Sequence, residues 1–406
     1  MTAKKNTYWI VIIAALGYFV DLYDLILYNV VKVPSLAAIG ITGEAYDHYE
    51  ITLFNWQMSG MLTGGLLWGI LGDKKGRISV LFGSIIMYSL ANIANGMVVN
   101  INQYVICRFI AGVGLAGELG AGITLVSETM QKEKRGIGSM IIVSFGALGA
   151  VTAGIVAKYF QWQNAYFIGG GMGLALLALR AGAFESGMYK NVSANKQVKR
   201  GNFFLLFKTR ERAFLYLNSI IIGIPIWFMI GVLINLSAKF VEVPGFTAKQ
   251  MGQDGVIYGY LGLSAGDVVS GLLSQWLKSR KKVIYMYLIA SLGLMIYYLF
   301  TLEMSSLQFR ISCFLLGLST GYWALFVQVA SENFGTNIRS TVTNTVPNFV
   351  RGCVVPITLS FAALSKSFGN HQAALVVGSV CIVMAIASLT CMKETFSKDL
   401  DYHEID

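Results

Sequence analysis

Long apolar segments alternate with short polar ones along the whole chain. Each apolar segment has about 20 residues, the length at which a helix rising 1.5 Å per residue crosses a hydrocarbon core of roughly 30 Å. The pattern predicts twelve membrane-spanning helices, at residues 8–31, 51–71, 78–99, 104–126, 137–157, 164–184, 213–237, 255–277, 283–302, 307–330, 342–364 and 371–392.

The composition supports a membrane protein. Hydrophobic residues make up 55% of the sequence and charged residues 13%, and the mean hydropathy is +0.62. These values lie outside the usual range of soluble domains. We therefore expect the lipid bilayer to be the main surrounding of this chain.

The net charge of +10 has a clear distribution along the sequence. Lysine and arginine gather in the N-terminal tail and after the even-numbered predicted helices, whereas the opposite loops are acidic or neutral. The positive-inside rule then places both termini in the cytoplasm. Because orientation explains the surplus charge, we expect no nucleic-acid partner, and we expect a multi-pass protein of the cell inner (cytoplasmic) membrane.

The chain divides into two similar halves. The longest polar connection, residues 185–212, separates an N-terminal bundle (residues 1–184) from a C-terminal bundle (residues 213–406). Glu128 and Arg135 after the fourth predicted helix recur as Glu332 and Arg339 after the tenth, at the same spacing. Repeats of six helices related by an axis along the membrane normal are typical of transporters whose site lies between the halves near the midplane.

Ionisable side chains inside the predicted helices are the first candidates for function. On insertion scales each costs about 2.5 to 3.5 kcal/mol at the centre of a lone helix. They must face an aqueous cavity, pair with one another or be neutral. The candidates are Asp21, Asp24, Arg108, Glu118, Asp267 and Arg351.

Two of these carboxylates lie on one face of the first predicted helix. Asp21, Asp24 and Tyr28 are spaced i, i+3 and i+7, which brings them to the same side, so we expect Tyr28 to contact substrate in the cavity. Two carboxylates one turn apart in a low dielectric repel each other, so we expect at least one to bind and release a proton near physiological pH. The alternative is that one of them caps a helix break or pairs with nearby backbone.

The two arginines predict contact with negative charge. Arg108 keeps its charge in proteins, so it needs a carboxylate partner or an anionic substrate. Arg351 follows Asn344 and Asn348 on one helical face that has no acid on the same turn. This face is either an anion contact or the partner of Asp267 in a bridge between helices.

The remaining candidates have weaker signals. Glu118 stands among small residues that permit close helix approach, and is either a second proton site or hydrogen-bonded within the first half. Four residues could line the cavity of the second half or serve only in packing: Trp227, Tyr322, Trp323 and Gln328. No metal-ligand spacing and no pair of nucleophile and base stands out, so we expect no metal, no cofactor and no enzyme activity.

Several motifs resemble those of the major facilitator superfamily. GILGDKKGR at residues 69–77 is similar to the family's motif between helices two and three. RFIAGVGLAGE at residues 108–118 resembles the fourth-helix motif of its sugar porter and metabolite:proton symporter branches, and KETFSKDLD at residues 393–401 resembles their C-terminal motif.

The chain also departs from some patterns of that family. NSIIIGIPIW at residues 218–227 replaces the Gln-rich motif of the sugar branch, which makes a sugar substrate less expected. SFGALGA at residues 144–150 lacks the Gly-Pro signature of drug:proton antiporters, which weakens an exporter interpretation. In the second half the loop motif has decayed to LKSRKK at residues 277–282.

The resemblance implies roles for particular residues. Helices one and four line the cavity in these families, and Asp24 and Arg108 match an aspartate and arginine that pair there, with protonation of Asp24 releasing Arg108. A second set matches residues that latch the outward-open state; its alternative role is topology signalling alone. This set comprises Asp73, Arg77, Glu128, Arg135, Glu185, Glu332, Arg339 and Glu394.

The sequence thus predicts an all-α membrane protein with twelve transmembrane helices in two six-helix bundles related by pseudo-two-fold symmetry. The predicted function is proton-coupled import of a small polar, carboxylate-bearing metabolite by a monomer that works through alternating access. Two alternatives stay open. One is proton-driven export of a larger metabolite such as a siderophore, and the other is a membrane sensor that does not transport.

Overall fold

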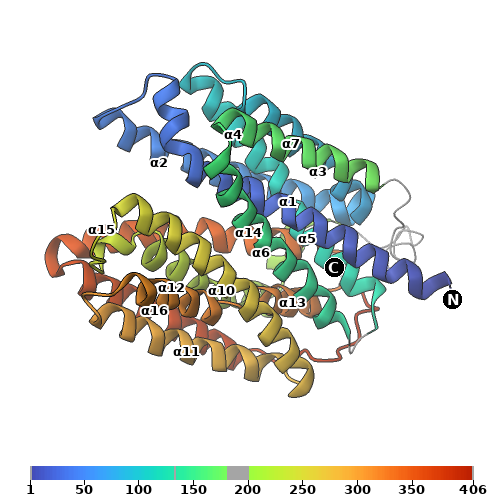
Figure 1. Cartoon of the computed structure of the whole chain (residues 1–406). Helices are drawn as coiled ribbons and strands as arrows, with labels where there is room; N and C mark the ends of the chain where they lie inside the picture. The colour runs from blue at the N-terminus through green and yellow to red at the C-terminus, as the bar shows by residue number, and fades with distance from the viewer. Residues whose placement is uncertain (1, 132–133, 181–200, 405–406) are drawn as a thin grey trace.

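The computed structural model describes residues 2–131, 134–180 and 201–404. Within these residues the chain is almost entirely helical, and the helices form two bundles, with the blue to green first half above the yellow to red second half in Figure 1. In the described part of the chain, ten helical segments are long and apolar enough to cross a membrane by length and composition.

The first bundle is built from seven described helices that make six spans. The fourth span is divided between two of them. The helices are α1 (Thr2–Ala38), α2 (Glu44–Lys75), α3 (Arg77–Asn95), α4 (Ile101–Leu115), α5 (Glu118–Thr129), α6 (Arg135–Tyr159) and α7 (Trp162–Leu179).

The second bundle follows the same plan in the described residues. A short 3-10 helix, Phe203–Phe207, precedes it, and the seventh span continues from α9 into a π-helical turn, Met229–Ile234. The helices are α9 (Arg210–Phe228), α10 (Ala248–Trp276), α11 (Arg280–Phe300), α12 (Ser306–Ser319), α13 (Trp323–Asn333), α14 (Arg339–Gly352), α15 (Val354–Phe368) and α16 (Asn370–Cys391). The twelve spans in two bundles predicted from the sequence are confirmed.

Three spans are broken, although the hydropathy pattern predicts them as continuous. The breaks separate α4 from α5, α12 from α13, and α14 from α15. Glycine stands at or beside each break, for example Gly117, Gly321 and Gly352, and glycine is a poor helix former. A break inside a membrane exposes backbone groups that need partners from neighbouring helices.

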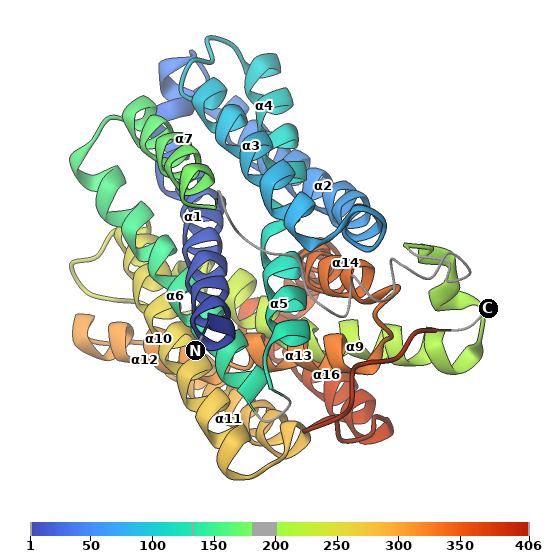
Figure 2. The ribbon, with the colours of Figure 1, turned by 90° about the vertical axis from the view of Figure 1, so that its right-hand side faces the viewer.

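Close contact between the bundles is concentrated at one end of the molecule, the end at which α2 ends and α14 begins. We call this the gate end; Figure 2 views it directly. There α2 and α5 pack on α14. The contact of α6 with α10 is longer and extends from Met140 against Gly271 to Gly154 against Ile257. Gly65 and Gly69 face α14 so closely that an added Cβ would lie 3.1 Å from the Asn344 carbonyl oxygen and 2.8 Å from the Thr341 Cα. Small residues thus allow the two backbones to meet.

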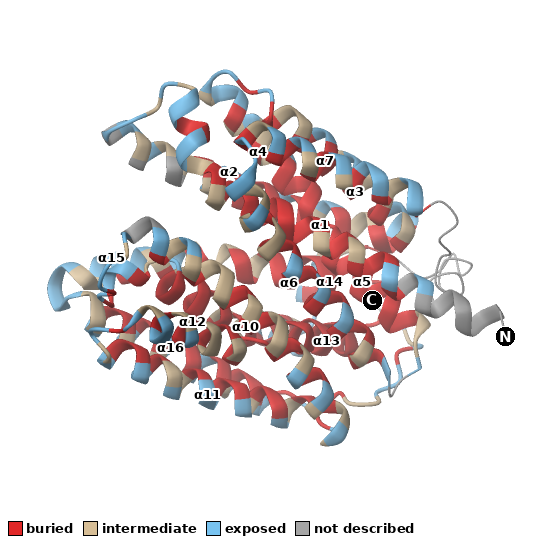
Figure 3. Cartoon of the chain, viewed as in Figure 1, coloured by how far each residue is buried: buried red, intermediate tan, exposed pale blue. Residues whose placement is uncertain are grey.

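Burial follows the arrangement of the bundles. Buried residues concentrate along α1, α5, α13 and α14, as the red segments in the middle of Figure 3 show. Large apolar side chains on the outer faces stay exposed, such as Leu90, Ile289 and Val383. Since a membrane helix is apolar on the side that meets lipid, these faces fit a bilayer.

Candidate functional site

Asp24 lies on α1, fully buried in the first bundle. It faces Asn92 of α3 and Arg108 of α4, and its Oδ1 packs on Gly169 of α7. Neither carboxylate oxygen has a hydrogen-bond partner among the described residues. Burying a charge without a partner is costly, so this site favours a carboxylate that binds a proton or a ligand.

Arg108 lies beside Asp24 without an ion pair to it among the contacts of the described residues. Its Nη2 donates to Oε1 of Gln57 on α2, and its guanidinium lies over the Tyr28 ring, 4.8 Å from the centroid. Its Nε and Nη1 are buried without a hydrogen-bond partner in the described chain. The pair implied by the family resemblance is therefore not formed in this conformation, although Arg108 lies within electrostatic range of Asp24.

Arg351 faces the first bundle from the second. Its Nη1 donates to Oδ1 of Asn348 at 3.2 Å, and its Nη2 donates to the hydroxyl of Tyr18 on α1 at 3.3 Å. Asp21, which is buried one turn from Asp24, lies within electrostatic range of Arg351. Asp24 and Arg108 therefore lie inside the first bundle, whereas Asp21 lies toward Arg351 of the second bundle.

Two tryptophans border this centre. The ring of Trp323 lies 5.5 Å from the Arg351 guanidinium and meets the Trp227 ring edge-on, with centroids 6.2 Å apart. Both indole Nε1 groups are buried without an acceptor among the described residues. Tyr322 instead donates to the Ile222 carbonyl at 3.0 Å, which directs it into its own bundle and away from the site.

Two polar residues near the centre bind backbone groups at the helix breaks. Asp267 of α10 accepts a hydrogen bond from the backbone N–H of Ala324 at 2.9 Å, so it caps the first turn of α13. The bridge from Asp267 to Arg351, one of the two alternatives drawn from the sequence, is not among the contacts of the described residues. Asn348 likewise donates to the Ala116 carbonyl oxygen at 3.0 Å, at the break between α4 and α5.

Two further predicted substrate contacts join the bundles instead. Asn344 donates to the Ser340 carbonyl oxygen at 2.8 Å and packs on Gly120 of α5. Gln328 accepts from Ser127 at 3.2 Å and from Ser139 at 2.5 Å, both of which belong to the first bundle. In this conformation these side chains are contacts of the closed interface.

Glu118 forms a buried ion pair that sequence analysis missed. Both of its oxygens accept from Arg180, which directly follows α7, and Arg180 also donates to the Leu81 carbonyl at 2.7 Å. Gly17 of α1 packs directly on this pair. Of the two alternatives for Glu118, the structure shows hydrogen bonding within the first half. Breaking such a pair typically costs about 3 to 5 kcal/mol.

Asp73 connects the bundles at the gate end. Its carboxylate accepts from the backbone N–H groups of Ser340 and Thr341, at 3.0 and 2.9 Å, in the first turn of α14. A carboxylate is favourable at a helix N-terminus because of the unpaired N–H groups and the helix dipole. Asp73 of the first bundle thus stabilises a helix of the second.

Glu128 is the second connection. It binds Arg77 of its own bundle at 2.7 Å and Arg339 of the other at 3.1 Å, with all three side chains buried. Arg77 also donates to the Thr336 carbonyl oxygen at 2.8 Å. In the second half Glu332 binds Arg280 at 3.3 Å, and like Arg77 this arginine is the first residue of its helix.

The C-terminal tail covers the gate end. Arg339 donates to the Leu400 carbonyl at 2.7 Å, and Arg135 donates to the Lys398 carbonyl at 3.1 Å. Burial alone would raise the pKa of Glu394, but hydrogen bonds from the Ser279 hydroxyl and the Arg280 backbone hold that pKa below its ordinary value. Glu185 lies outside the described residues.

We expect Glu128→Gln to open the gate end. The variant leaves two buried arginines without their carboxylate, which should destabilise the closed conformation by about 3 to 5 kcal/mol. A change of about 1.4 kcal/mol already shifts the ratio of closed to open molecules tenfold. The five native cysteines are replaced, and spin labels are attached at the exposed positions Lys75 and Lys282. The distance between the two labels should be longer in Glu128→Gln than in the wild type.

Glu118→Gln is the matched control because it breaks the buried pair with Arg180, both of whose members belong to the first bundle. It should lower thermal stability and leave the label distance unchanged. Equal distances in wild type and Glu128→Gln would contradict the role of Glu128 as a latch.

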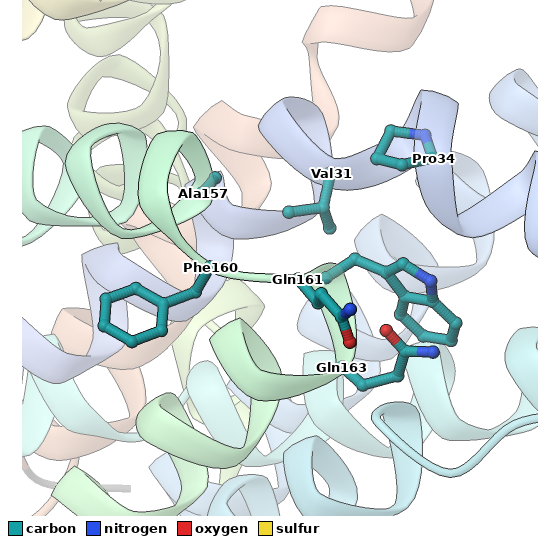
Figure 4. Close-up of a pocket in the computed structure, with 7 residues that line it drawn as sticks. Val31, Pro34, Ala157, Phe160, Gln161 and Gln163 are labelled. Atoms are coloured by element: carbon teal, nitrogen blue, oxygen red, sulfur yellow. The ribbon is translucent and has the colours of Figure 1, made fainter.

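A cavity of about 450 Å³ lies at the opposite end, between α1 and the turn that joins α6 to α7. Figure 4 shows its lining, with Val31 and Pro34 on one side and Phe160, Gln161 and Gln163 on the other. None of the residues predicted for substrate or proton binding lines it. Among the described residues no cluster of His, Cys, Asp or Glu could hold a metal ion.

Comparison with known proteins places the chain among transporters. The family model described as Major Facilitator Superfamily matches residues 14–346. The putative niacin/nicotinamide transporter of Bacillus subtilis is 26% identical, with 96% of each chain covered. The 3-(3-hydroxy-phenyl)propionate transporter of Escherichia coli is 32% identical over 31% of this chain and 32% of its own. A solved proton:xylose symporter superposes with a TM-score of 0.78 at 15% identity, covering 98% of both chains.

Proposed function

The chain belongs to the major facilitator superfamily and is a secondary transporter rather than an enzyme, and from that premise we propose that it imports a small carboxylate-bearing metabolite together with a proton. Asp24 is the proposed proton site, and Arg351 is the proposed contact of the substrate carboxylate. The protein acts as a monomer in the cell inner membrane with both termini cytoplasmic.

One observation carries this proposal. Four charged side chains are buried along α1, with Asp24 in electrostatic range of Arg108 and Asp21 in range of Arg351. Each retains polar atoms without a hydrogen-bond partner among the described residues. Buried polar groups are normally paired. A site that keeps both acidic and basic groups unpaired is suited to a ligand that supplies an anion and to a proton that neutralises a carboxylate.

The surroundings of Arg351 support a carboxylate attached to a flat ring. The guanidinium offers a fork of N–H donors that matches a carboxylate, and Trp227 and Trp323 border it with aromatic faces and unpaired N–H donors. Relatives named for niacin, benzoate and 3-(3-hydroxy-phenyl)propionate fit a ring compound with a carboxylate, and the relative named for niacin/nicotinamide fits the ring. The departure from the Gln-rich sugar motif at residues 218–227 points the same way.

The proposed cycle uses two states of the gate. With the positive-inside orientation, the gate end faces the cytoplasm, and this conformation is closed on that side by Asp73, Glu128 and Arg339. A proton on Asp24 and a carboxylate at Arg351 neutralise the unpaired charges, which lowers the cost of moving the bundles past each other. Release of the proton in the cytoplasm returns Asp24 to its charged form beside Arg108.

Uptake into liposomes with an acidic exterior tests the proposal. A panel of nicotinate, benzoate, nicotinamide and xylose should give accumulation of the ring carboxylates and none of xylose. Protein-free liposomes, which measure passive entry of the weak acids, are the necessary control. Accumulation of xylose but of no carboxylate would overturn the proposed substrate class.

A further inference from the structure

A short aromatic segment, Phe203–Phe207, lies on the surface where the chain enters the second bundle. Leu205 and Leu206 of this segment are buried, whereas Phe204 is 78% exposed and Phe207 is 47% exposed. The segment is a 3-10 helix, and in such a helix residues i and i+3 lie above one another. Phe204 and Phe207 therefore point to the same, exposed side.

The segment lies at the membrane boundary of the span that follows it. The candidate span Arg210–Ile234 has 25 residues and is about 37 Å long, which exceeds a hydrocarbon core of roughly 30 Å. Its first residues therefore reach the level of the lipid headgroups. Figure 2 shows the segment in yellow-green at the edge of the molecule, beside the C-terminus, where lipid rather than protein is its neighbour.

Arg210 stands at the end of the lipid-facing side of α9. Phe214 and Leu217 follow it at i+4 and i+7 on the same face, and both are 50% exposed. A long basic side chain at the end of an apolar face extends toward the headgroups. Arg210 is itself exposed and has no carboxylate partner among the described residues. Lys208, which directly follows Phe207, is exposed as well.

The acidic residue beside Arg210 lies on another side of the helix. Glu211 is exposed, but Asn218 shares its face of α9 at i+7 and is buried, so this face turns toward the bundle. The next residue, Arg212, pairs with Glu404 at 2.9 Å. The charges on the side of the exposed rings are therefore positive.

Both bundles hold the aromatic segment in place. Gly201 donates its backbone N–H to the Asn337 carbonyl oxygen at 2.9 Å. An added Cβ on Gly201 would lie 2.6 Å from the Ile70 carbonyl oxygen of α2. The Phe207 ring meets the ring of the buried Tyr216 of α9, with centroids 5.8 Å apart. A fixed backbone thus presents the exposed aromatic and basic side chains.

We propose that this side of the chain binds an anionic phospholipid in the leaflet at the gate end. Aromatic side chains are favourable at the boundary between headgroups and hydrocarbon, and basic side chains beside them attract anionic headgroups. The inference goes beyond the proposed function, because it depends neither on the substrate nor on the direction of transport. The four residues, which we call the lipid surface, are Phe204, Phe207, Lys208 and Arg210.

Native mass spectrometry of the purified full-length protein in detergent tests this proposal. The protein is titrated with phosphatidylglycerol and, separately, with phosphatidylcholine of the same acyl chains, and the peaks with one added lipid give a dissociation constant for each. The wild type should bind phosphatidylglycerol more tightly. The double variant Lys208→Gln with Arg210→Gln should bind phosphatidylglycerol about 25-fold more weakly, since each basic residue contributes about a factor of five. Its binding of phosphatidylcholine should not change.

The matched control is the double variant Lys75→Gln with Lys282→Gln. Both lysines are exposed, and their loss changes the net charge by the same amount, but neither belongs to the lipid surface. This variant should bind phosphatidylglycerol as the wild type does. Equal losses in the two double variants would mean that the lipid responds only to overall charge, and would overturn the proposal.

Phe204→Ser tests the aromatic part of the lipid surface and keeps both charges. It should weaken binding of both lipids about tenfold, because the contact of the ring with apolar chains does not depend on the headgroup. A dimer that disappears in Phe204→Ser would mean that a second copy of the protein covers this surface, and would overturn the proposal. Equal binding of the two lipids by the wild type would overturn it too.

Discussion

Asp24→Asn is expected to abolish accumulation of nicotinate driven by a pH gradient and to leave exchange of nicotinate across the membrane intact. Asparagine has nearly the same shape as aspartate but cannot take up and release a proton. It resembles the neutral state of Asp24, so the bundles should still move with substrate bound. Uptake against a gradient needs the proton cycle, whereas exchange between labelled and unlabelled substrate does not.

Asp267→Asn is the matched control for this experiment. Asp267 is also a buried carboxylate of the centre, but it accepts from the Ala324 backbone N–H, a contact that the asparagine carbonyl oxygen can keep. This variant should retain accumulation. If Asp24→Asn still accumulated nicotinate in proportion to the pH gradient, Asp24 would not be the coupling site.

Arg351→Lys is expected to weaken nicotinate binding by about 10-fold to 150-fold, the effect of losing a charge-assisted hydrogen bond of about 1.5 to 3 kcal/mol. Lysine keeps the charge but lacks the planar fork that matches a carboxylate and stacks on Trp323. Binding of nicotinamide, which has the same ring and no carboxylate, should change much less. Titration calorimetry on the purified protein gives both affinities.

Arg310→Lys provides the control for this arginine. Arg310 is partly exposed and binds Asp254 at 2.7 Å, away from the centre, where exposed pairs contribute about 0 to 1 kcal/mol. Its variant should bind both compounds as the wild type does. Equal losses for nicotinate and nicotinamide in Arg351→Lys would contradict a contact between Arg351 and the carboxylate.

The positions of the spans could be predicted because each span appears in the hydropathy profile as an apolar segment. The breaks within the fourth, tenth and eleventh spans could not, since the segments on both sides of Gly117, for example, are equally apolar. The breaks depend on partners from distant helices, such as Asn348 for the Ala116 carbonyl and Asp267 for the Ala324 N–H. A hydropathy profile contains no information about such partners.

The charged residues were predicted in part. Asp21, Asp24, Arg108 and Arg351 do lie together, because an isolated charge in a membrane helix is costly wherever it points. Which charged side chains pair depends on the depth of each residue in the membrane and on the rotation of its helix about its own axis. Arg180 lies near the end of its predicted span, where an arginine usually extends to the interface, so its buried pair with Glu118 was missed.

Arg280 could have been recognised from the internal repeat. It precedes Glu332 by 52 residues, and Arg77 precedes Glu128 by 51, so aligning the halves on their glutamates makes the two arginines equivalent. The decay of the loop motif around it concealed this match. Gln328 and Asn344 had no comparable signal, because a polar residue on a buried face serves an interface or a ligand equally well.

The central claim is that substrate and proton move together, and simultaneous measurement of both in one set of liposomes tests it most directly. The vesicles contain a pH-sensitive dye, have equal pH on both sides, and receive labelled nicotinate outside. Coupled movement predicts that the interior acidifies as nicotinate enters, and that Asp24→Asn and protein-free vesicles show no such protein-dependent acidification. Entry of nicotinate through the wild-type protein at constant internal pH would contradict it.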